Sequence, residues 1–178
     1  GGYSFAYISS GTGTATSYNA NGNTLTIIAG GSAGTEAYGG YSYAVSSTGN
    51  ATSGEASSNT VYVQSGSNGD VYGGASKAVT AFVSNRQTAT SAAADKNKVY
   101  ISGGSVSNVY GGYSGASGST TEKSGTASSN IVTISGSSTT SCVRTITIWL
   151  THRPSPRRMP AGVRCCGCRG PVLLARAA

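Results

Sequence analysis

The sequence predicts an all-β fold, a right-handed parallel β-helix (β-solenoid) of about four imperfect repeats of 33–38 residues. Two phrases that recur in phase lead to this prediction, because self-similarity at such a spacing is typical of solenoids. The phrase Tyr-Gly-Gly begins at Tyr38, Tyr72 and Tyr110, and the chain opens on a further Gly-Gly pair. The second phrase begins at Asn23, Asn59, Asn97 and Asn130, so its copies are 36, 38 and 33 residues apart.

Each of these asparagines opens a short segment in which apolar residues alternate with others. The apolar positions are Leu25 and Ile27, Val61 and Val63, Val99 and Ile101, and Val132 and Ile134. Between them stand Thr26, Tyr62, Tyr100 and Thr133. Such alternation is typical of a half-buried strand, so we expect the apolar residues to face inward and the residues between them outward. A cluster rich in Gly and Ser follows each segment and predicts a turn.

Two columns of small residues complete each repeat. Alanine precedes each Asn by three residues, at Ala20, Ala56, Ala94 and Ala127, and the phrase Ala-Thr-Ser begins at Ala15, Ala51 and Ala89. In a stack of repeats these columns let the walls approach closely, and the asparagines are expected to form an amide ladder. The simplest rung has an Asn strand, a Tyr-Gly-Gly strand and an Ala-Thr-Ser strand, although two thinner rungs per repeat fit the same spacing. Residues 1–141 show no helical period, so no helix is expected there.

Composition divides the chain near Ser141. Residues 1–141 carry five positive and five negative side chains, whereas residues 142–178 hold seven arginines and no acidic residue, which accounts for the formal net charge of +7. All four Cys and all four Pro also lie in residues 142–178. We interpret residues 1–141 as the β-solenoid region. Residues 142–178 form a basic Cys-, Pro- and Arg-rich tail that is not native to it, as a shift of reading frame would produce; a genuine basic terminal segment is the alternative.

The tail does not indicate a defined chemistry. Its charge lies on a short segment that is broken by prolines and has no base-reading module, so we expect no nucleic-acid partner. Cys165, Cys166, Cys168 and a lone His152 lack the paired spacing of a structural zinc site, so neither a metal nor another cofactor is expected. Residues 145–150 alternate and are predicted to form a last strand, with disorder beyond Pro154.

The chain begins on Gly rather than Met and shows no secretory leader, so we expect it to be part of a longer protein. It has no apolar stretch long enough to span a bilayer, and we expect no membrane insertion of this segment. A solenoid cut within its repeats exposes apolar rungs and strand edges, which predicts end-to-end self-association.

The repeats resemble those of a known class of surface proteins. Residues 97–105 read N-K-V-Y-I-S-G-G-S and residues 109–114 read V-Y-G-G-Y-S. Both phrases are similar to the passenger repeats of large bacterial autotransporter outer-membrane proteins and adhesin-like surface proteins, and the resemblance covers about residues 1–141. It implies a secreted β-helix at the cell surface or outer membrane. The passengers of that class include adhesins, proteases and esterases, so the resemblance alone leaves the activity open.

No enzyme is predicted, because residues 1–141 contain neither His nor Cys and so lack the usual nucleophile and base pairs. Glu36, Asp70 and Asn108 occupy equivalent positions two residues before the repeated Tyr. Neighbouring acids are used by polysaccharide-cleaving β-helices. We favour a solvated corner position instead, since Asn108 shows that other polar residues fit there.

The tyrosine columns are the predicted ligand-binding residues: Tyr38, Tyr72 and Tyr110 share one position, and Tyr62 and Tyr100 another. Exposed columns of Tyr suit sugar rings or another protein's surface, while the simpler interpretation is that they cover the solenoid wall. The expected function is structural or adhesive, with glycans or other cell-surface proteins as partners. A polysaccharide-acting or ice-binding β-helix is the alternative, although Tyr62 and Tyr100 interrupt the threonine array that ice binding requires.

Overall fold

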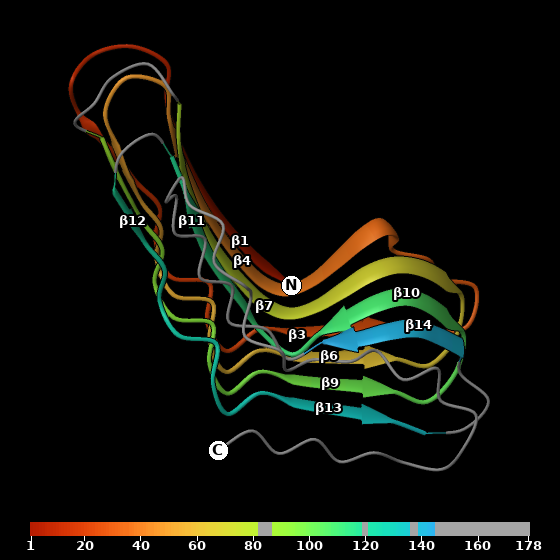
Figure 1. Ribbon diagram of the computed structural model, residues 1–178. Coiled ribbons are helices and arrows are strands. Elements are labelled where there is room, and N and C mark those ends of the chain that lie inside the picture. The colour runs from red at the N-terminus through yellow and green to blue at the C-terminus, as the bar shows by residue number, and fades with distance from the viewer. Residues whose placement is uncertain (82–86, 119–120, 136–138, 145–178) are drawn as a thin grey trace, which may run out of the picture.

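The computed structural model describes residues 1–81, 87–118, 121–135 and 139–144, and these residues form a parallel β-solenoid of about four turns. Figure 1 shows the strands of successive turns stacked on one another along the coil. No helix occurs in the described ranges. The predicted all-β repeat architecture is therefore confirmed.

Three parallel sheets form the walls of the coil, and each turn adds one rung to all three. Sheet A contains β1 (Gly2–Ile8), β4 (Gly34–Ser46), β7 (Ser67–Thr80), β10 (Ser105–Tyr110) and β14 (Thr139–Arg144), with β11 (Tyr113–Ser117) paired to β7. Sheet B contains β2 (Thr14–Thr16), β5 (Asn50–Thr52), β8 (Thr88–Thr90) and β12 (Thr121–Lys123). Sheet C contains β3 (Thr24–Ile27), β6 (Thr60–Val63), β9 (Lys98–Ile101) and β13 (Ile131–Ile134). Of the two arrangements that the spacing allowed, the chain adopts the three-strand rung.

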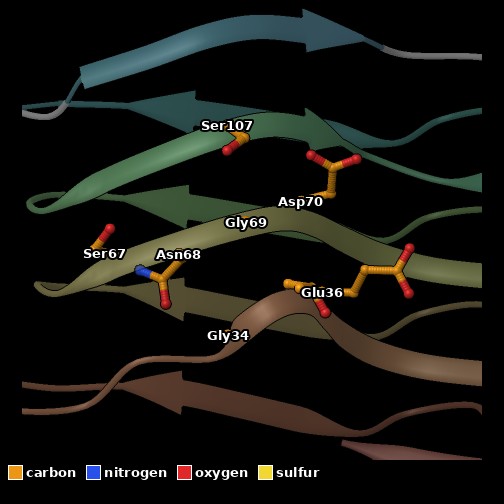
Figure 2. Close-up of a pocket in the computed structure, with 8 residues that line it drawn as sticks. Gly34, Glu36, Ser67, Asn68, Gly69, Asp70 and Ser107 are labelled. Carbon is orange, nitrogen blue, oxygen red and sulfur yellow. The ribbon is translucent and has the colours of Figure 1, made fainter.

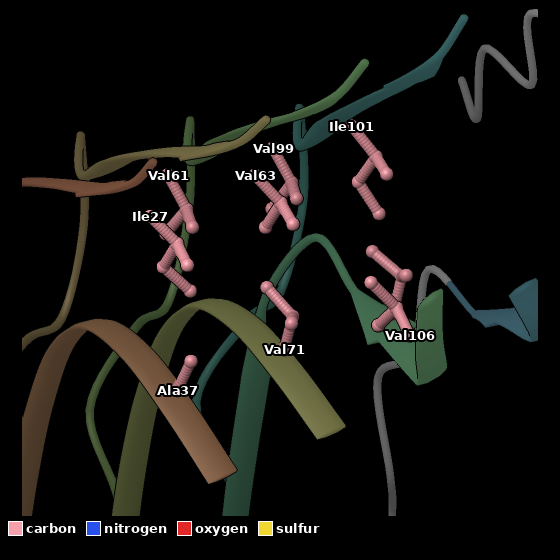
Figure 3. Close-up of a cluster of buried hydrophobic side chains, with 9 residues drawn as sticks. Ile27, Ala37, Val61, Val63, Val71, Val99, Ile101 and Val106 are labelled. Carbon is pink, nitrogen blue, oxygen red and sulfur yellow. The ribbon is translucent and has the colours of Figure 1, made fainter. Parts of the chain in front are cut away.

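The main core lies between sheet C and the first half of sheet A. Val61, Val63, Val99 and Ile101 of sheet C are at most 1% exposed, and they face Val71 and its neighbours from sheet A. Figure 3 shows these side chains converging between the two walls. The residues between them, Tyr62 and Tyr100, stack on each other outside the core. The predicted strand phase is confirmed, and full burial of each such apolar side chain stabilises the fold by about 1.5–3 kcal/mol.

A second, thinner core lies between sheet B and the second half of sheet A. Its fully buried members are all alanines, and the partly buried Ala6 and Ile8 pack against them. The buried members are Ala15, Ala44, Ala51, Ala78, Ala89 and Ala116. Buried serine pairs separate it from the main core, with Ser53 Oγ 2.8 Å from Ser76 Oγ and Ser91 Oγ 2.9 Å from Ser114 Oγ. The small side chains let the two walls approach closely, as predicted from the alanine columns.

Asparagine side chains hold the corner between sheets B and C. Asn59 donates its backbone N–H and its Nδ2 to Asn97 Oδ1 at 2.9 and 3.1 Å, and Asn97 donates to Asn130 Oδ1 at the same two distances. Asn23 donates to Asn59 in the same way. The residue before each Asn has a left-handed backbone: Gly22, Ser58, Lys96 and Ser129. The predicted amide ladder is confirmed. The left-handed residue turns the chain at this corner, immediately before the Asn that joins the ladder.

Strand β14 runs across the position at which the composition changes, since it extends from Thr139 to Arg144 and pairs with β10 throughout. The strand predicted for residues 145–150 and the disorder predicted beyond Pro154 lie outside the described residues.

Candidate binding surface on sheet A

A bend in the long strands of sheet A brings aromatic residues together on its outer face. Gly39 and Gly40 are consecutive residues that both lie on the inner side of β4. They interrupt the alternation of inward and outward residues, so the side chains of Tyr38 and Tyr41 both lie on the outer face. Three residues of a straight strand span about 10 Å. The rings of Tyr38 and Tyr41 are nevertheless stacked with centroids 4.4 Å apart and an interplanar angle of 8°. The strand therefore bends toward this face, as the ribbons of β4 and β7 show in Figure 1.

The predicted column of Tyr38, Tyr72 and Tyr110 lies on this face as a continuous stack. Ring centroids are 4.6 Å apart between Tyr38 and Tyr72 and 4.4 Å apart between Tyr72 and Tyr110, with interplanar angles of 13° and 4°. The flat faces of these rings are thus turned largely toward one another. Ring edges and hydroxyls remain to meet solvent or a partner, and such edges carry the positive side of the ring quadrupole.

Further aromatic residues extend the stack, and sequence reasoning did not find them. Tyr3 contacts the ring of Tyr41, Phe5 that of Tyr43, and Tyr113 meets Tyr72 edge-on with centroids 6.3 Å apart. We call the set Tyr3, Phe5, Tyr38, Tyr41, Tyr43, Tyr72, Tyr110 and Tyr113 the aromatic face. The sequence does contain a pattern from which part of this set could have been predicted, the phrase Tyr-Gly-Gly-Tyr that begins at Tyr38 and at Tyr110. Two consecutive glycines on the inner side of the strand place both flanking tyrosines on its outer side.

The second predicted column lies on another wall. Tyr62 and Tyr100 stack on the outer side of sheet C, with centroids 5.1 Å apart. Because the main core separates sheets A and C, the five predicted tyrosines do not form one site. Thr26 and Thr133 flank this pair in register, so the expected Thr-Tyr-Tyr-Thr column is present.

Polar groups border the aromatic face on β4, β7 and β10. Glu36 pairs in register with Asp70, and its Oε2 accepts a hydrogen bond from the Tyr38 hydroxyl at 2.9 Å. Asp70 Oδ1 accepts a hydrogen bond from Asn108 Nδ2 at 2.7 Å. These residues adjoin a shallow, open hollow of about 600 Å³ that also includes Asn68; Figure 2 shows Glu36 and Asp70 projecting from neighbouring strands beside it. The predicted row of equivalent polar positions is therefore present, and each of these carboxylates has a hydrogen-bond donor.

Burial raises the pKa of three hydroxyls of the aromatic face, those of Tyr38, Tyr41 and Tyr72. It raises the pKa of Tyr38 well above the usual 10.0, with the hydrogen bond to Glu36 as a second cause. Burial is also the largest cause of the raised pKa of Tyr41 and Tyr72, followed by the neighbouring phenols Tyr43 and Tyr110 respectively. A tyrosine hydroxyl is ordinarily neutral at neutral pH and can donate or accept hydrogen bonds. The raised pKa of Tyr38, Tyr41 and Tyr72 extends this neutral form to higher pH.

The only cation recorded over a ring in the described ranges is Lys77, whose Nζ lies 5.4 Å from the centroid of the Tyr43 ring. It supplies a positive group at the opposite end of the face from Glu36. The described residues include no group of three or more His, Cys, Asp or Glu side chains that is arranged to hold a metal ion. None of them forms a helix long and apolar enough to cross a membrane.

Comparisons of the chain with protein-family models, with curated proteins and with solved structures found no match.

Proposed function

We propose that this chain is a structural and adhesive segment of a secreted bacterial surface protein, similar to an autotransporter passenger, and that the aromatic face is its contact surface. A β-solenoid provides a long rigid wall on which one kind of side chain is repeated at every rung. The observation that carries the proposal is the stack of Tyr38, Tyr72 and Tyr110 with its flanking rings, because tyrosine is enriched where proteins contact partners.

The chemistry of this surface favours a partner that accepts and donates many hydrogen bonds. Neutral phenol hydroxyls lie beside the carboxylates of Glu36 and Asp70, and Lys77 adds a positive charge. Glycans and the polar surfaces of other cell-surface proteins offer such groups. The contact is made chiefly by the ring edges and the hydroxyls that they carry, because the ring faces are occupied within the stack.

The proposal includes no catalytic activity. The pair of Glu36 and Asp70 is the observation that favours the polysaccharide-acting alternative, but both carboxylates already hold a hydrogen bond, to Tyr38 and Asn108. No His lies in residues 1–141 to serve as an additional acid or base. A sugar-releasing assay on plant and bacterial polysaccharides tests this point, and release of reducing ends that is lost in Glu36→Gln would contradict it.

Adhesion is tested with variants that keep the ring stack and remove its hydroxyls. Beads coated with the wild-type chain are compared with beads coated with a Tyr38→Phe, Tyr72→Phe and Tyr110→Phe triple variant on glycan arrays and epithelial cells. We expect the triple variant to lose binding, because phenylalanine fills the same space without the outward polar groups. The matched control is Tyr62→Phe with Tyr100→Phe on sheet C, which should bind like wild type. Equal binding by both variants, or no binding by the wild-type chain, would refute the proposal.

A further inference from the structure

Tyrosine is the side chain of residues 1–141 that gives up an electron most readily. All eleven tyrosines lie in this region, whereas the cysteines, the methionine, the tryptophan and the histidine all lie in residues 142–178. Thiols and thioethers are the side chains that oxidants commonly attack, and residues 1–141 contain neither. A one-electron oxidant that reaches these turns therefore acts on tyrosine.

Three of the tyrosines stand in register in successive turns of sheet A. Tyr38 pairs with Tyr72, and Tyr72 pairs with Tyr110. Their ring planes differ by 13° and 4°, and their centroids are 4.6 and 4.4 Å apart. Because in-register strands stack identical side chains atom over atom, the ring carbon beside each hydroxyl faces its counterpart in the next turn. These are the carbons at which two phenoxyl radicals join.

Glu36 places a proton acceptor on one ring of this column. The Tyr38 hydroxyl donates a hydrogen bond to Glu36 Oε2 at 2.9 Å, and among the described residues it is the only tyrosine hydroxyl that donates to a carboxylate. Burial raises the pKa of Tyr38 above the usual 10.0, so at neutral pH the ring keeps its proton until an electron is removed. A base within hydrogen-bonding distance can take that proton in the same step.

We propose that this column is a site of oxidative cross-linking, at which a one-electron oxidant of the kind that a haem peroxidase forms from hydrogen peroxide joins Tyr38 to Tyr72 as dityrosine. Each of the two tyrosines gives up one electron and its phenolic proton. The resulting radicals form a carbon–carbon bond between the ring carbons beside their hydroxyls. Each of these carbons then loses its hydrogen as a proton, and each oxygen takes up a proton. The two electrons and two protons released overall reduce one hydrogen peroxide to two waters.

The stacking lets one entry point serve both rings. Once Tyr38 is a radical, Tyr72 can pass an electron to it, because the two rings are in contact. Tyr72 then gives its phenolic proton to water, and Glu36 returns its proton to Tyr38. A second oxidation of Tyr38 completes the pair of radicals.

The new bond ties one turn of the solenoid to the next. It closes the loop of chain between Tyr38 and Tyr72, and such a cross-link restricts the unfolded chain, as a disulfide does. Residues 1–141 contain no cysteine from which a disulfide could form. The cross-link therefore stabilises the folded coil, and it requires no adhesion partner.

The tyrosine pair on sheet C offers a comparison within the same chain. Tyr62 and Tyr100 are also in register, with centroids 5.1 Å apart and an interplanar angle of 13°. They have the stacked geometry without a carboxylate on either hydroxyl among the described residues. We expect coupling to be slower there than in the sheet A column.

The test treats the full-length chain with a haem peroxidase and limiting hydrogen peroxide, at neutral pH and low protein concentration. The cysteines are first blocked with iodoacetamide, because a free thiol reduces a phenoxyl radical, and circular dichroism confirms that the blocked chain keeps its β-structure. Cleavage after Glu55 and Lys77 places the three tyrosines of the column on separate peptides. Mass spectrometry of these peptides then identifies each linked pair.

Three variants separate the roles of the residues. Tyr38→Phe removes one partner of the cross-link, and Glu36→Gln removes the proton acceptor while keeping the size of the side chain. The matched control is Asp95→Asn, which removes a carboxylate whose hydrogen bonds come from Thr126 and Ser128 on another part of the coil.

We expect a link between Tyr38 and Tyr72 within single chains, and a higher urea midpoint for the linked chain. Asp95→Asn should couple at the wild-type rate, and Glu36→Gln at a rate about tenfold lower or less, since a positioned base accelerates proton transfer. Tyr38→Phe should lose the link. Folded wild-type chains that give no link between turns overturn the proposal. So does coupling of Tyr62 to Tyr100 as fast as that of Tyr38 to Tyr72, or a wild-type rate in Glu36→Gln.

Discussion

Replacing Asn97 with alanine is expected to cause one of the largest losses of stability available from a single polar side chain in this fold. Asn97 is fully buried; its Oδ1 accepts two hydrogen bonds from Asn59, and its Nδ2 donates one to Asn130. Alanine removes all three and leaves the N–H and Nδ2 of Asn59 as buried donors without partners. Each such donor costs about 1–3 kcal/mol, so the free energy of unfolding should fall by roughly 2–6 kcal/mol.

The matched control is Asn23→Ala, which deletes the same atoms at the first rung. Asn23 donates to Asn59 Oδ1 through both its N–H and its Nδ2, and the N–H bond survives the substitution. No described residue donates to Asn23 Oδ1, so no buried donor loses its partner. The expected loss is about 1 kcal/mol.

Urea titration followed by circular dichroism measures both variants against wild type. Because the total stability of a domain is commonly about 5–15 kcal/mol, the Asn97 variant should unfold at a much lower urea concentration than the Asn23 variant. Equal losses from the two substitutions would refute the reasoning, because they would show that position in the ladder does not determine the cost.

Two further predictions concern the core and the aromatic face. Val99→Asp places a carboxylate in the main core and should cost several kcal/mol, whereas Tyr100→Asp points outward and should cost about 1 kcal/mol or less; thermal unfolding of the pair checks this, and equal shifts would contradict it. Because the pKa values of Tyr38, Tyr41 and Tyr72 are raised in the folded state, their stabilising effect is full below pH 10.0 and is lost as the pH rises above it toward the folded values. Urea midpoints should therefore show no fall from this cause below pH 10 and should fall as the pH rises above it, less steeply in Tyr72→Phe; a profile that stays flat above pH 10 would contradict the assignment.

Most of the architecture could be predicted because the repeats stack equivalent residues. Once Asn59 and Asn97 are aligned, the alternation at Val61 and Val99 determines the inward face of sheet C, and the solenoid follows. The aromatic face could not be predicted as fully, because it depends on a bend within one strand. Tyr41 follows Tyr38 by three residues, which in a straight strand places the two on opposite sides.

The left-handed backbone conformation of the residue before each asparagine was not predicted either. Gly22 is the residue type expected for a positive φ, but Ser58, Lys96 and Ser129 take the same conformation in later turns. Three residue types, Gly, Ser and Lys, at one backbone position leave no pattern in the sequence. The conformation is imposed by the ladder, because the following Asn has to donate both of its N–H groups to the next turn.

The two phrases that reveal the repeat belong to one structural unit, which explains why they recur in phase. A Cβ on Gly40 would overlap both the Ala20 carbonyl oxygen and the Asn59 amide, and a Cβ on Gly74 would meet the equivalent groups of the next turn. The ladder therefore requires glycine opposite it, and sheet A bends at these glycines. The bend in turn brings Tyr38 and Tyr41 into contact on the outside. The interior corner that stabilises each turn and the aromatic face proposed for adhesion thus depend on the same Gly-Gly pair, so a substitution there should impair both together.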